Sequence, residues 1–354
     1  MNKYDTIKEA FDWTLVENIN PDFFFEAQGK KGQTILVCKP QPRIDGLSRI
    51  TIDLTAGKDH QGEVTIEYSA KILGARYSEL ISMDTIEAAH INIIRTGIID
   101  FNIEEVLANA RALKVHQTAD FTLSNSLPTY GRAIRKLWVP NKYDLHCDAR
   151  GRAEWESFSF LRDINANPEY LKFYNKLREF DMSKNREFRD KLTPAQLSLI
   201  RQYFQDKTRA ELCLSGKRKI KQHLPDVDSK VMLIAVLNSK VDALGNLCSG
   251  LLAPLVADET ISTKLDFTSS LADLREYYMA CILEAGGFDF ETVCENLKAH
   301  CSRSTFYGIK PKFKALLNRY LAHSSDGSGV KQLLGELQQA VAARVSPYGM
   351  MIPS

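Results

Sequence analysis

The chain has 354 residues, of which 44% are hydrophobic and 25% are charged, and its formal net charge is +2. This composition is that of an ordinary globular protein, and the length suffices for two domains. No apolar run approaches the roughly 18 residues of a membrane span, and the first residues lack a signal-peptide layout, so we expect a cytoplasmic protein. Seven cysteines are scattered without a Cys-x-x-Cys pair, which favours reduced thiols over a zinc site or a disulfide framework.

Strand patterns dominate the first two thirds of the chain. Residues 34–39 are strand-like, whereas 48–57 and 62–73 alternate with period two and predict a hairpin. Residues 83–97 and 102–113 have the periodicity and capping residues of helices. Further strands are expected at 114–124, 152–163 and 208–216, with a polar helical stretch at 182–205.

The pattern changes at about residue 228. Helical periodicity follows at 230–252, 269–285, 289–302 and 310–323, and "SSDGSG" at 324–329 is typical of a flexible linker before a last helix. We therefore predict an α+β protein. Its first domain, residues 1–227, is an antiparallel sheet with flanking helices, and its second, residues 228–354, is mainly helical.

Basic residues are concentrated in two places. Residues 201–223 carry seven Lys or Arg against two acids, and "GRAIRKLW" at 131–138 is a second basic segment. Such patches on a near-neutral protein fit contact with a polyanion, although a solvated charged face explains them equally well. The candidate contacts are Arg132, Arg135, Arg209, Lys217, Arg218, Lys219 and Lys221.

Several predicted strands carry ionisable residues at alternate positions, which share one face. "HQTAD" places His116 and Asp120 together, and "TRAEL" places Arg209 beside Glu211. Glu67 lies in the middle of another strand. If these faces coincide, carboxylates and an imidazole would meet, a donor set that suits Mg²⁺ or Mn²⁺. The alternative is that each strand has one solvated face.

The order of these motifs resembles that of the gene II replication initiators of filamentous phages. The segment "EWESFSFLRDINANPEYLKFYNKLREF", followed by "TRAELCLSGKRKIKQHLP", carries most of the resemblance. It extends back through "IEYSAKILG" and "VHQTAD" and forward to about residue 320. The Tyr-x-Lys-x-x-Glu and Arg-x-Glu segments also look like those of plasmid rolling-circle initiators.

The resemblance implies a DNA nicking and joining enzyme with Tyr174 as the nucleophile. Lys176 and Glu179 match the other positions of the tyrosine motif. The implied metal ligands are Glu67 and Glu211, together with His116, which stands where the family usually has an aspartate. Asp120 is the alternative ligand at that strand. Tyr170, four residues before Tyr174, is a candidate second nucleophile.

We therefore expect a rolling-circle replication initiator of a phage or plasmid. Its expected reaction is metal-dependent, site-specific nicking and rejoining of one origin strand through a 5′-phosphotyrosine, with Mg²⁺ or Mn²⁺ as cofactor. The expected partners are supercoiled and single-stranded origin DNA, a host helicase and a polymerase; a homodimer is a further candidate assembly, and no membrane is involved. The alternatives are a transposase or relaxase with the same tyrosine chemistry and a non-catalytic DNA-binding regulator.

Overall fold

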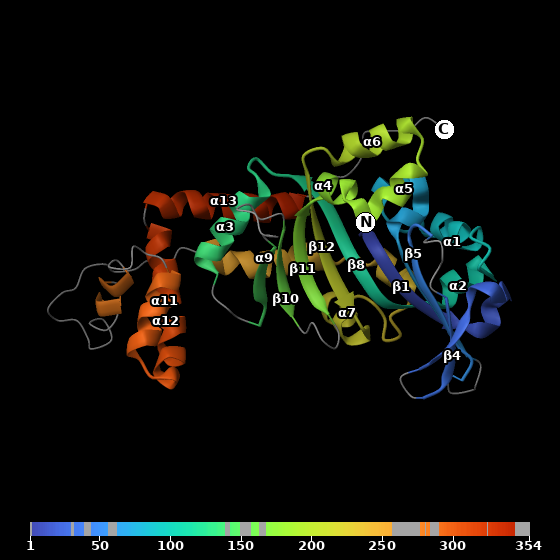
Figure 1. The fold of residues 1–354 in the computed structure, drawn as a ribbon, viewed down its shortest axis with the longest axis horizontal. Helices are drawn as coiled ribbons and strands as arrows, with labels where there is room; N and C mark the ends of the chain where they lie inside the picture. Colours follow the sequence, from blue (N-terminus) through green and yellow to red (C-terminus); the bar gives the residue numbers. More distant parts are fainter. Residues whose placement is uncertain are drawn as a thin grey trace. The chain divides into compact units, whose positions relative to one another are not determined.

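The computed structural model has an α+β fold (Figure 1). Two compact units divide the chain: unit 1 contains residues 1–122 and 161–246, and unit 2 contains residues 123–160 and 247–343. The described residues are 2–29, 32–38, 44–55, 62–138, 142–148, 157–162, 168–256, 277–279, 281–283, 290–323 and 325–343.

The division into units does not follow the predicted boundary at residue 227. Residues after this boundary belong to unit 1 because they are hydrogen-bonded to its first residues. The side-chain amide of Asn2 donates to the carbonyl oxygens of Ser239 at 3.0 Å and Val241 at 2.9 Å. Residues 123–160 instead group with the helices near the end of the chain.

An antiparallel sheet forms the centre of unit 1. Its strands follow the spatial order β3-β4-β5-β6-β1-β8-β12-β11, so the first strand of the chain is inserted between β6 and β8. A separate pair is formed by β2 (Val16–Ile19) and β7 (Ile99–Phe101). The strands of the main sheet are β1 (Tyr4–Asp12), β3 (Phe25–Gln28), β4 (Thr34–Cys38), β5 (Leu47–Asp53), β6 (Glu63–Ser69), β8 (Arg111–Thr122), β11 (Glu169–Asn175) and β12 (Lys207–Ser215).

The two faces of this sheet differ sharply in polarity. One face, here called the apolar face, carries Ile7, Ile66, Val115 and Leu212, all of them completely buried. The opposite face, here called the polar face, carries the residues that alternate with these. Among its members are Thr6, Lys8, Glu67, Lys114, His116, Thr118, Asp120, Tyr170, Lys172, Tyr174, Arg209, Glu211 and Cys213.

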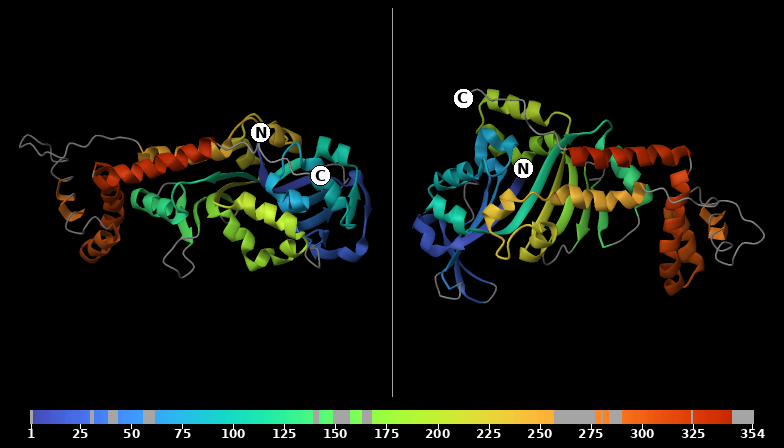
Figure 2. Two further views of the ribbon diagram at one scale, coloured as in Figure 1. Left: turned by 90° about the horizontal axis from the view of Figure 1, so that it is seen from above. Right: turned by 180° about the vertical axis from the view of Figure 1, so that it is seen from behind.

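Helices cover both faces of the sheet in unit 1. Tyr4 donates to the carbonyl of Val236 on the apolar side, and His90 reaches Glu9 there at 2.8 Å. Seen from above, α8 and the group α4 to α6 lie on opposite sides of the sheet (Figure 2, left). The helices of unit 1 are η1 (Trp13–Leu15), η2 (Pro21–Phe23), η3 (Ala70–Glu79), α1 (Ile86–Ile94), α2 (Ile103–Asn109), α4 (Lys176–Asp181), η4 (Ser183–Asn185), α5 (Arg186–Asp190), α6 (Pro194–Phe204), α7 (Lys217–His223) and α8 (Leu233–Asn238).

Aromatic rings join the helices that cover one end of the polar face. The ring of Tyr77 in η3 lies 6.3 Å from that of Phe180, 5.4 Å from Phe188 and 5.7 Å from Phe204. All four residues are buried. This aromatic cluster closes the end of the polar face at which β11 stops, whereas Lys8, Glu67 and other residues further along the face stay half-buried.

Unit 2 is mainly helical. Leu283, Val293, Phe313 and two leucines of α12 form a buried apolar cluster in it. Its elements are α3 (Leu127–Leu137), β9 (Asp144–Asp148), most of β10 (Ser157–Arg162), most of α9 (Ala243–Val256), α11 (Phe290–His300), α12 (Arg303–His323) and α13 (Ser325–Ala343).

The main strands and helices agree with the sequence analysis, with corrections to four elements. The helix predicted at 102–113 ends at Asn109, and β8 begins at Arg111, whereas the helix predicted at 230–252 is interrupted between α8 and α9. Residues 269–276 of a further predicted helix lie outside the described residues. The hairpin is confirmed as β5 and β6, but β6 ends at Ser69, and residues 70–79 form a 3-10 helix where the strand was expected to continue. The linker predicted at 324–329 is wrong for residues 325–329, which begin α13. No helix in the described ranges has both the length and the apolar character needed to cross a membrane.

Candidate active site

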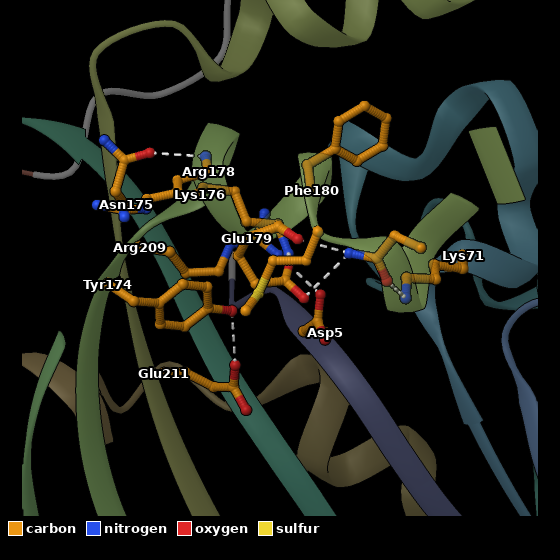
Figure 3. Close-up of polar contacts among 12 residues, drawn as sticks. Asp5, Lys71, Tyr174, Asn175, Lys176, Arg178, Glu179, Phe180, Arg209 and Glu211 are labelled. Carbon is orange, nitrogen blue, oxygen red and sulfur yellow. Dashed lines mark hydrogen bonds and ion pairs between the residues drawn. The ribbon is translucent and has the colours of Figure 1, made fainter. Parts of the chain in front are cut away.

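Tyr174 lies near the end of β11 with its side chain on the polar face. Asn175, the next residue, ends the strand and caps α4, because its side-chain oxygen accepts from the backbone N–H of Arg178 at 2.8 Å. The chain therefore turns from strand to helix directly after the tyrosine. As a result Tyr174 projects from the sheet, and Lys176 and Glu179 belong to the helix above it (Figure 3).

The hydroxyl of Tyr174 is held by Glu211 of the neighbouring strand β12. The phenol oxygen donates to Oε2 of Glu211 at 2.9 Å, and Oε1 of the same carboxylate accepts from Nδ1 of His116 at 2.5 Å. The tyrosine is 9% exposed, so its hydroxyl is shielded from bulk water. Three predicted site residues from three adjacent strands thus form one hydrogen-bonded row.

Burial and the neighbouring carboxylate both favour the protonated form of Tyr174. Burial raises the pKa of Tyr174 well above its usual value, and the charge of Glu211 raises it further, while Arg209 opposes them. Burial alone would lower the pKa of His116, but the Glu211 carboxylate outweighs it and raises that pKa. The resting row is therefore a phenol, a carboxylate and an imidazolium, in which the carboxylate is the only group able to accept a proton.

Lys176 is buried among aromatic rings, which the sequence did not indicate. It is 2% exposed, and its Nζ bonds Oε2 of Glu179 at 2.9 Å. The same Nζ lies 5.0 Å from the ring centroid of Tyr77, 5.6 Å from Tyr174 and 5.7 Å from Phe204. These contacts are cation–π interactions in a desolvated site.

Glu179 completes this arrangement from α4. Besides Lys176, it pairs with Lys184 at 2.7 Å. Burial alone would raise the pKa of Glu179, but the two lysines outweigh burial and hold it well below its usual range. Lys176 and Glu179 thus form an ion pair beside the tyrosine, in which the lysine is buried and the carboxylate is partly exposed.

Arg209 was expected to contact DNA, and the structure corrects this. Its side chain is 0% exposed and lies between two carboxylates. The guanidinium donates to both oxygens of Asp120, at 2.6 and 2.7 Å, and to Asp5 at 2.7 Å. A buried arginine with three such bonds is a structural anchor between β12, β8 and β1.

The four predicted metal ligands are not brought together. Asp120 is occupied by Arg209, and Glu67 pairs with Lys114 at 2.9 Å. Glu67 also lies on β6, three strands from Glu211 in the sheet order. Within the described ranges, no three His, Cys, Asp or Glu side chains form a group that would hold a metal ion. Only His116 and Glu211 of the predicted set meet.

This remaining pair has donors that suit a divalent cation. Nε2 of His116 is buried and has no hydrogen-bond partner in the part of the chain that the structure describes. The other ring nitrogen, Nδ1, bonds the Glu211 carboxylate, and Mg²⁺ and Mn²⁺ are often held by one or two protein ligands with phosphate and water oxygens completing the shell. The atom that this pair offers to a cation is therefore Nε2 of His116, with Glu211 orienting the imidazole from Nδ1.

The predicted basic contacts fall into different surroundings. Lys219 forms a buried ion pair with Glu169, which points to the apolar face, so the expectation that Lys219 contacts DNA is wrong. Lys217 and Arg218 are exposed on the same helix, α7, and Lys221 is half-buried. In unit 2, Arg132 and Arg135 are exposed on α3, and Arg135 pairs with Glu291.

The position of α7 differs from the expected one beside the active residues. It follows Ser215, the last residue of β12, whereas Tyr174 is paired with Arg209 near the start of that strand. Figure 1 shows α7 and α4 at opposite ends of β12. The basic run of α7 is thus remote from Tyr174.

Lys172 is a site residue that the sequence analysis missed. It lies two residues before Tyr174 on the polar face, opposite Glu211 in the register of β11 and β12. Its Nζ is 5.3 Å from the ring centroid of Tyr174. Strand alternation alone places residues 172 and 174 on one face, so the signal was present in "LKFYN".

Tyr170 is also on the polar face, further along β11. Its ring centroid lies 5.8 Å from that of His116, and burial, followed by the charge of Glu211, raises its pKa above the usual value. Tyr170 therefore contacts the imidazole of the row, whereas Tyr174 is the tyrosine bonded to its carboxylate.

Comparison with known proteins adds little to this geometry. No protein-family model matches the sequence, and no curated protein matches it either. Among solved structures, a rolling circle replication initiator protein from Geobacillus stearothermophilus aligns with 77% of this chain and 90% of its own. The TM-score is 0.33 at 11% identity, a likeness too low to support an argument about function.

Proposed function

We propose that this protein nicks and rejoins DNA through Tyr174 as a rolling-circle replication initiator. The observation that carries the proposal is the hydrogen bond from the Tyr174 hydroxyl to Glu211, on a sheet face that also presents Lys172 beside the ring. The sequence resemblance to gene II and plasmid initiators points to the same tyrosine. The proposed substrate is one strand of origin DNA, in supercoiled or single-stranded form.

The row of side chains suggests how the tyrosine is activated. As the Tyr174 oxygen attacks the phosphorus atom, its proton passes to Glu211, whose 2.9 Å contact is within the reach of a general base. His116 bonds the carboxylate through Nδ1 before this transfer and stays bonded to it afterwards. The bond from phosphorus to the 3′ oxygen breaks, and that oxygen takes a proton from water.

The products explain why joining needs no nucleotide cofactor. The 5′ phosphate stays esterified to Tyr174, and the freed 3′ hydroxyl is the primer for a host polymerase, with a host helicase opening the duplex. Return of a 3′ hydroxyl to the phosphotyrosine reverses every bond change. The ester therefore conserves the free energy of the broken phosphodiester until the strand is rejoined.

A divalent cation, Mg²⁺ or Mn²⁺, belongs to this proposal. His116 would hold it through Nε2, with Glu211 orienting the imidazole through Nδ1, and the cation would neutralise charge on the phosphate oxygens. Asp120 and Glu67 are left out of this ligand set because Arg209 and Lys114 already bind them.

The test is capture of a covalent protein–DNA adduct. Purified protein is incubated with Mn²⁺ and either supercoiled DNA or a random-sequence pool of single-stranded oligonucleotides, then run on denaturing gels. Adduct formation by the wild type and its loss in Tyr174→Phe are expected, with Tyr170→Phe as the matched control that keeps the adduct. Sequencing of the captured strands would identify the preferred site.

Other outcomes separate the alternatives. An adduct that persists in Tyr174→Phe and disappears only in the double Tyr170/Tyr174 variant would transfer the nucleophile role to Tyr170. Sequence-specific binding without cleavage under any metal condition would favour a non-catalytic regulator. Cleavage at transposon ends or transfer origins would favour a transposase or relaxase.

A further inference from the structure

Two lysines flank the Tyr174 ring, and they differ in accessibility. The Nζ atoms of Lys172 and Lys176 lie 5.3 Å and 5.6 Å from the ring centroid. Lys172 projects from the polar face of β11, whereas Lys176 belongs to the first turn of α4. Either position would suit a cation that binds the attacked phosphate, so the surroundings of each lysine decide between them.

Lys176 has no free approach to a phosphate. Its ammonium is 2% exposed, bonded to Glu179, and within 6 Å of three ring centroids. Reaching a phosphate would require the ammonium to leave both Glu179 and the three rings that surround it, which is costly because Lys176 itself is desolvated. The pair with Glu179 instead fixes the start of α4 over the ring of Tyr174.

Lys172 has the opposite surroundings. It is half-buried and in contact with the Tyr174 ring, and among the described residues no carboxylate forms an ion pair with it. Glu211 lies opposite it across the two strands, but both of its oxygens are already bonded, one to Tyr174 and one to His116. A cation without a paired carboxylate, beside a nucleophile, favours the approach of an anionic substrate group.

From these differences we infer that Lys172, and not the motif lysine Lys176, holds the phosphate that Tyr174 attacks. Lys176 is then a positioning residue that fixes the tyrosine ring. This inference rests on the function proposed above, because it names the group that binds the phosphate in that reaction. It reverses the assignment that the Tyr-x-Lys motif suggests.

The first experiment measures phosphate contact without requiring cleavage. Binding of a fluorescent random-sequence single-stranded oligonucleotide is followed by anisotropy over a range of salt concentrations, in the Tyr174→Phe background. Each phosphate contact contributes about 0.7 to the slope of log affinity against log salt for single strands. Lys172→Met is expected to reduce the slope by about 0.7, and Lys176→Met to leave it unchanged.

The second experiment measures the adduct rate at saturating DNA. Lys172→Met is expected to lower it by about 10²-fold, the usual effect of removing one charge-stabilising group. Lys172→Arg should recover most of the rate, because arginine keeps the positive charge at this half-buried position. Lys176→Arg should not recover the rate that Lys176→Met loses, because the Lys176 ammonium is packed within 6 Å of three aromatic ring centroids. Lys8→Met, on the same face but on β1, is the control that keeps the wild-type rate.

The failures of the two proposals are distinguishable. If the wild type forms no adduct with any DNA, the proposed nicking function fails, and the salt slopes still decide whether Lys172 contacts a phosphate. If the wild type forms the adduct and Lys172→Met matches it in rate and slope, only the inference about Lys172 is overturned. If Lys176→Met reduces the salt slope and Lys172→Met does not, the residue that binds the phosphate is Lys176.

Discussion

Arg209 and Asp120 face each other across β12 and β8 and are joined by two hydrogen bonds, Nε to Oδ1 at 2.6 Å and Nη2 to Oδ2 at 2.7 Å. Both side chains are withdrawn from solvent, and Asp5 binds the same guanidinium. Because the two side chains bind each other, Arg209 is not available to contact DNA and Asp120 is not available to bind a metal ion.

Arg209→Met should therefore destabilise the fold. Removing the cation leaves the carboxylates of Asp120 and Asp5 uncompensated, which typically costs about 3–5 kcal/mol for a buried pair. Urea unfolding of the variant against wild type measures the change in free energy. A variant as stable as wild type but with a smaller salt slope for DNA binding would show that Arg209 contacts phosphate after all.

The two lysines at the start of α7 should behave differently, although both were expected to contact DNA. Lys219→Met should lower stability because buried Glu169 loses a charged partner, leaving it with His223 at 3.1 Å and Arg162 at 3.9 Å. Lys217→Met removes the same charge from an exposed position and should change stability by less than about 0.5 kcal/mol. Thermal unfolding of the two variants is the measurement, and equal melting temperatures would contradict the buried pair.

Stability should depend on pH through Glu179. Its folded-state pKa is held below the unfolded value, so its contribution is fully present above the unfolded pKa of about 4.3 and is lost as the pH falls through the folded value. Glu179→Gln should be less stable than wild type at pH 7, and this difference should shrink as the pH is lowered below about 5. Denaturant unfolding at a series of pH values tests this, and a constant difference would exclude the ion pair as its cause.

Substitution of Glu211 and of Glu67 should have different effects on metal binding. Chelation by EDTA is expected to abolish adduct formation, and Mn²⁺ to restore it. Glu211→Gln should weaken Mn²⁺ binding by at least about tenfold, because it removes the carboxylate of the pair, whereas Glu67→Gln should leave binding unchanged. Calorimetric titration with Mn²⁺ alone gives the affinities without DNA. Loss of binding in Glu67→Gln would restore the larger ligand set.

Local pattern in the sequence was enough to predict the α+β class, the hairpin, the strand β12 and the faces that the ionisable residues share. Alternation with period two is a property of each strand by itself, so His116 with Asp120, and Arg209 with Glu211, could be grouped correctly before any fold was known. The choice of Tyr174 among the tyrosines rested on its motif, and the structure brings it to Glu211.

Which site residues meet depends on strand order and register, and these are set by distant parts of the chain. β1, from residues whose sequence gave no clear pattern, is inserted between β6 and β8 and so separates Glu67 from Glu211 by three strand spacings, roughly 14 Å. The capping of α4 by Asn175 turned Lys176 away from the strand face and into the aromatic cluster, which Tyr77 and Phe204 join from η3 and α6. A side chain's charge partner is set by what packs against it, and only the tertiary structure brings those groups into contact.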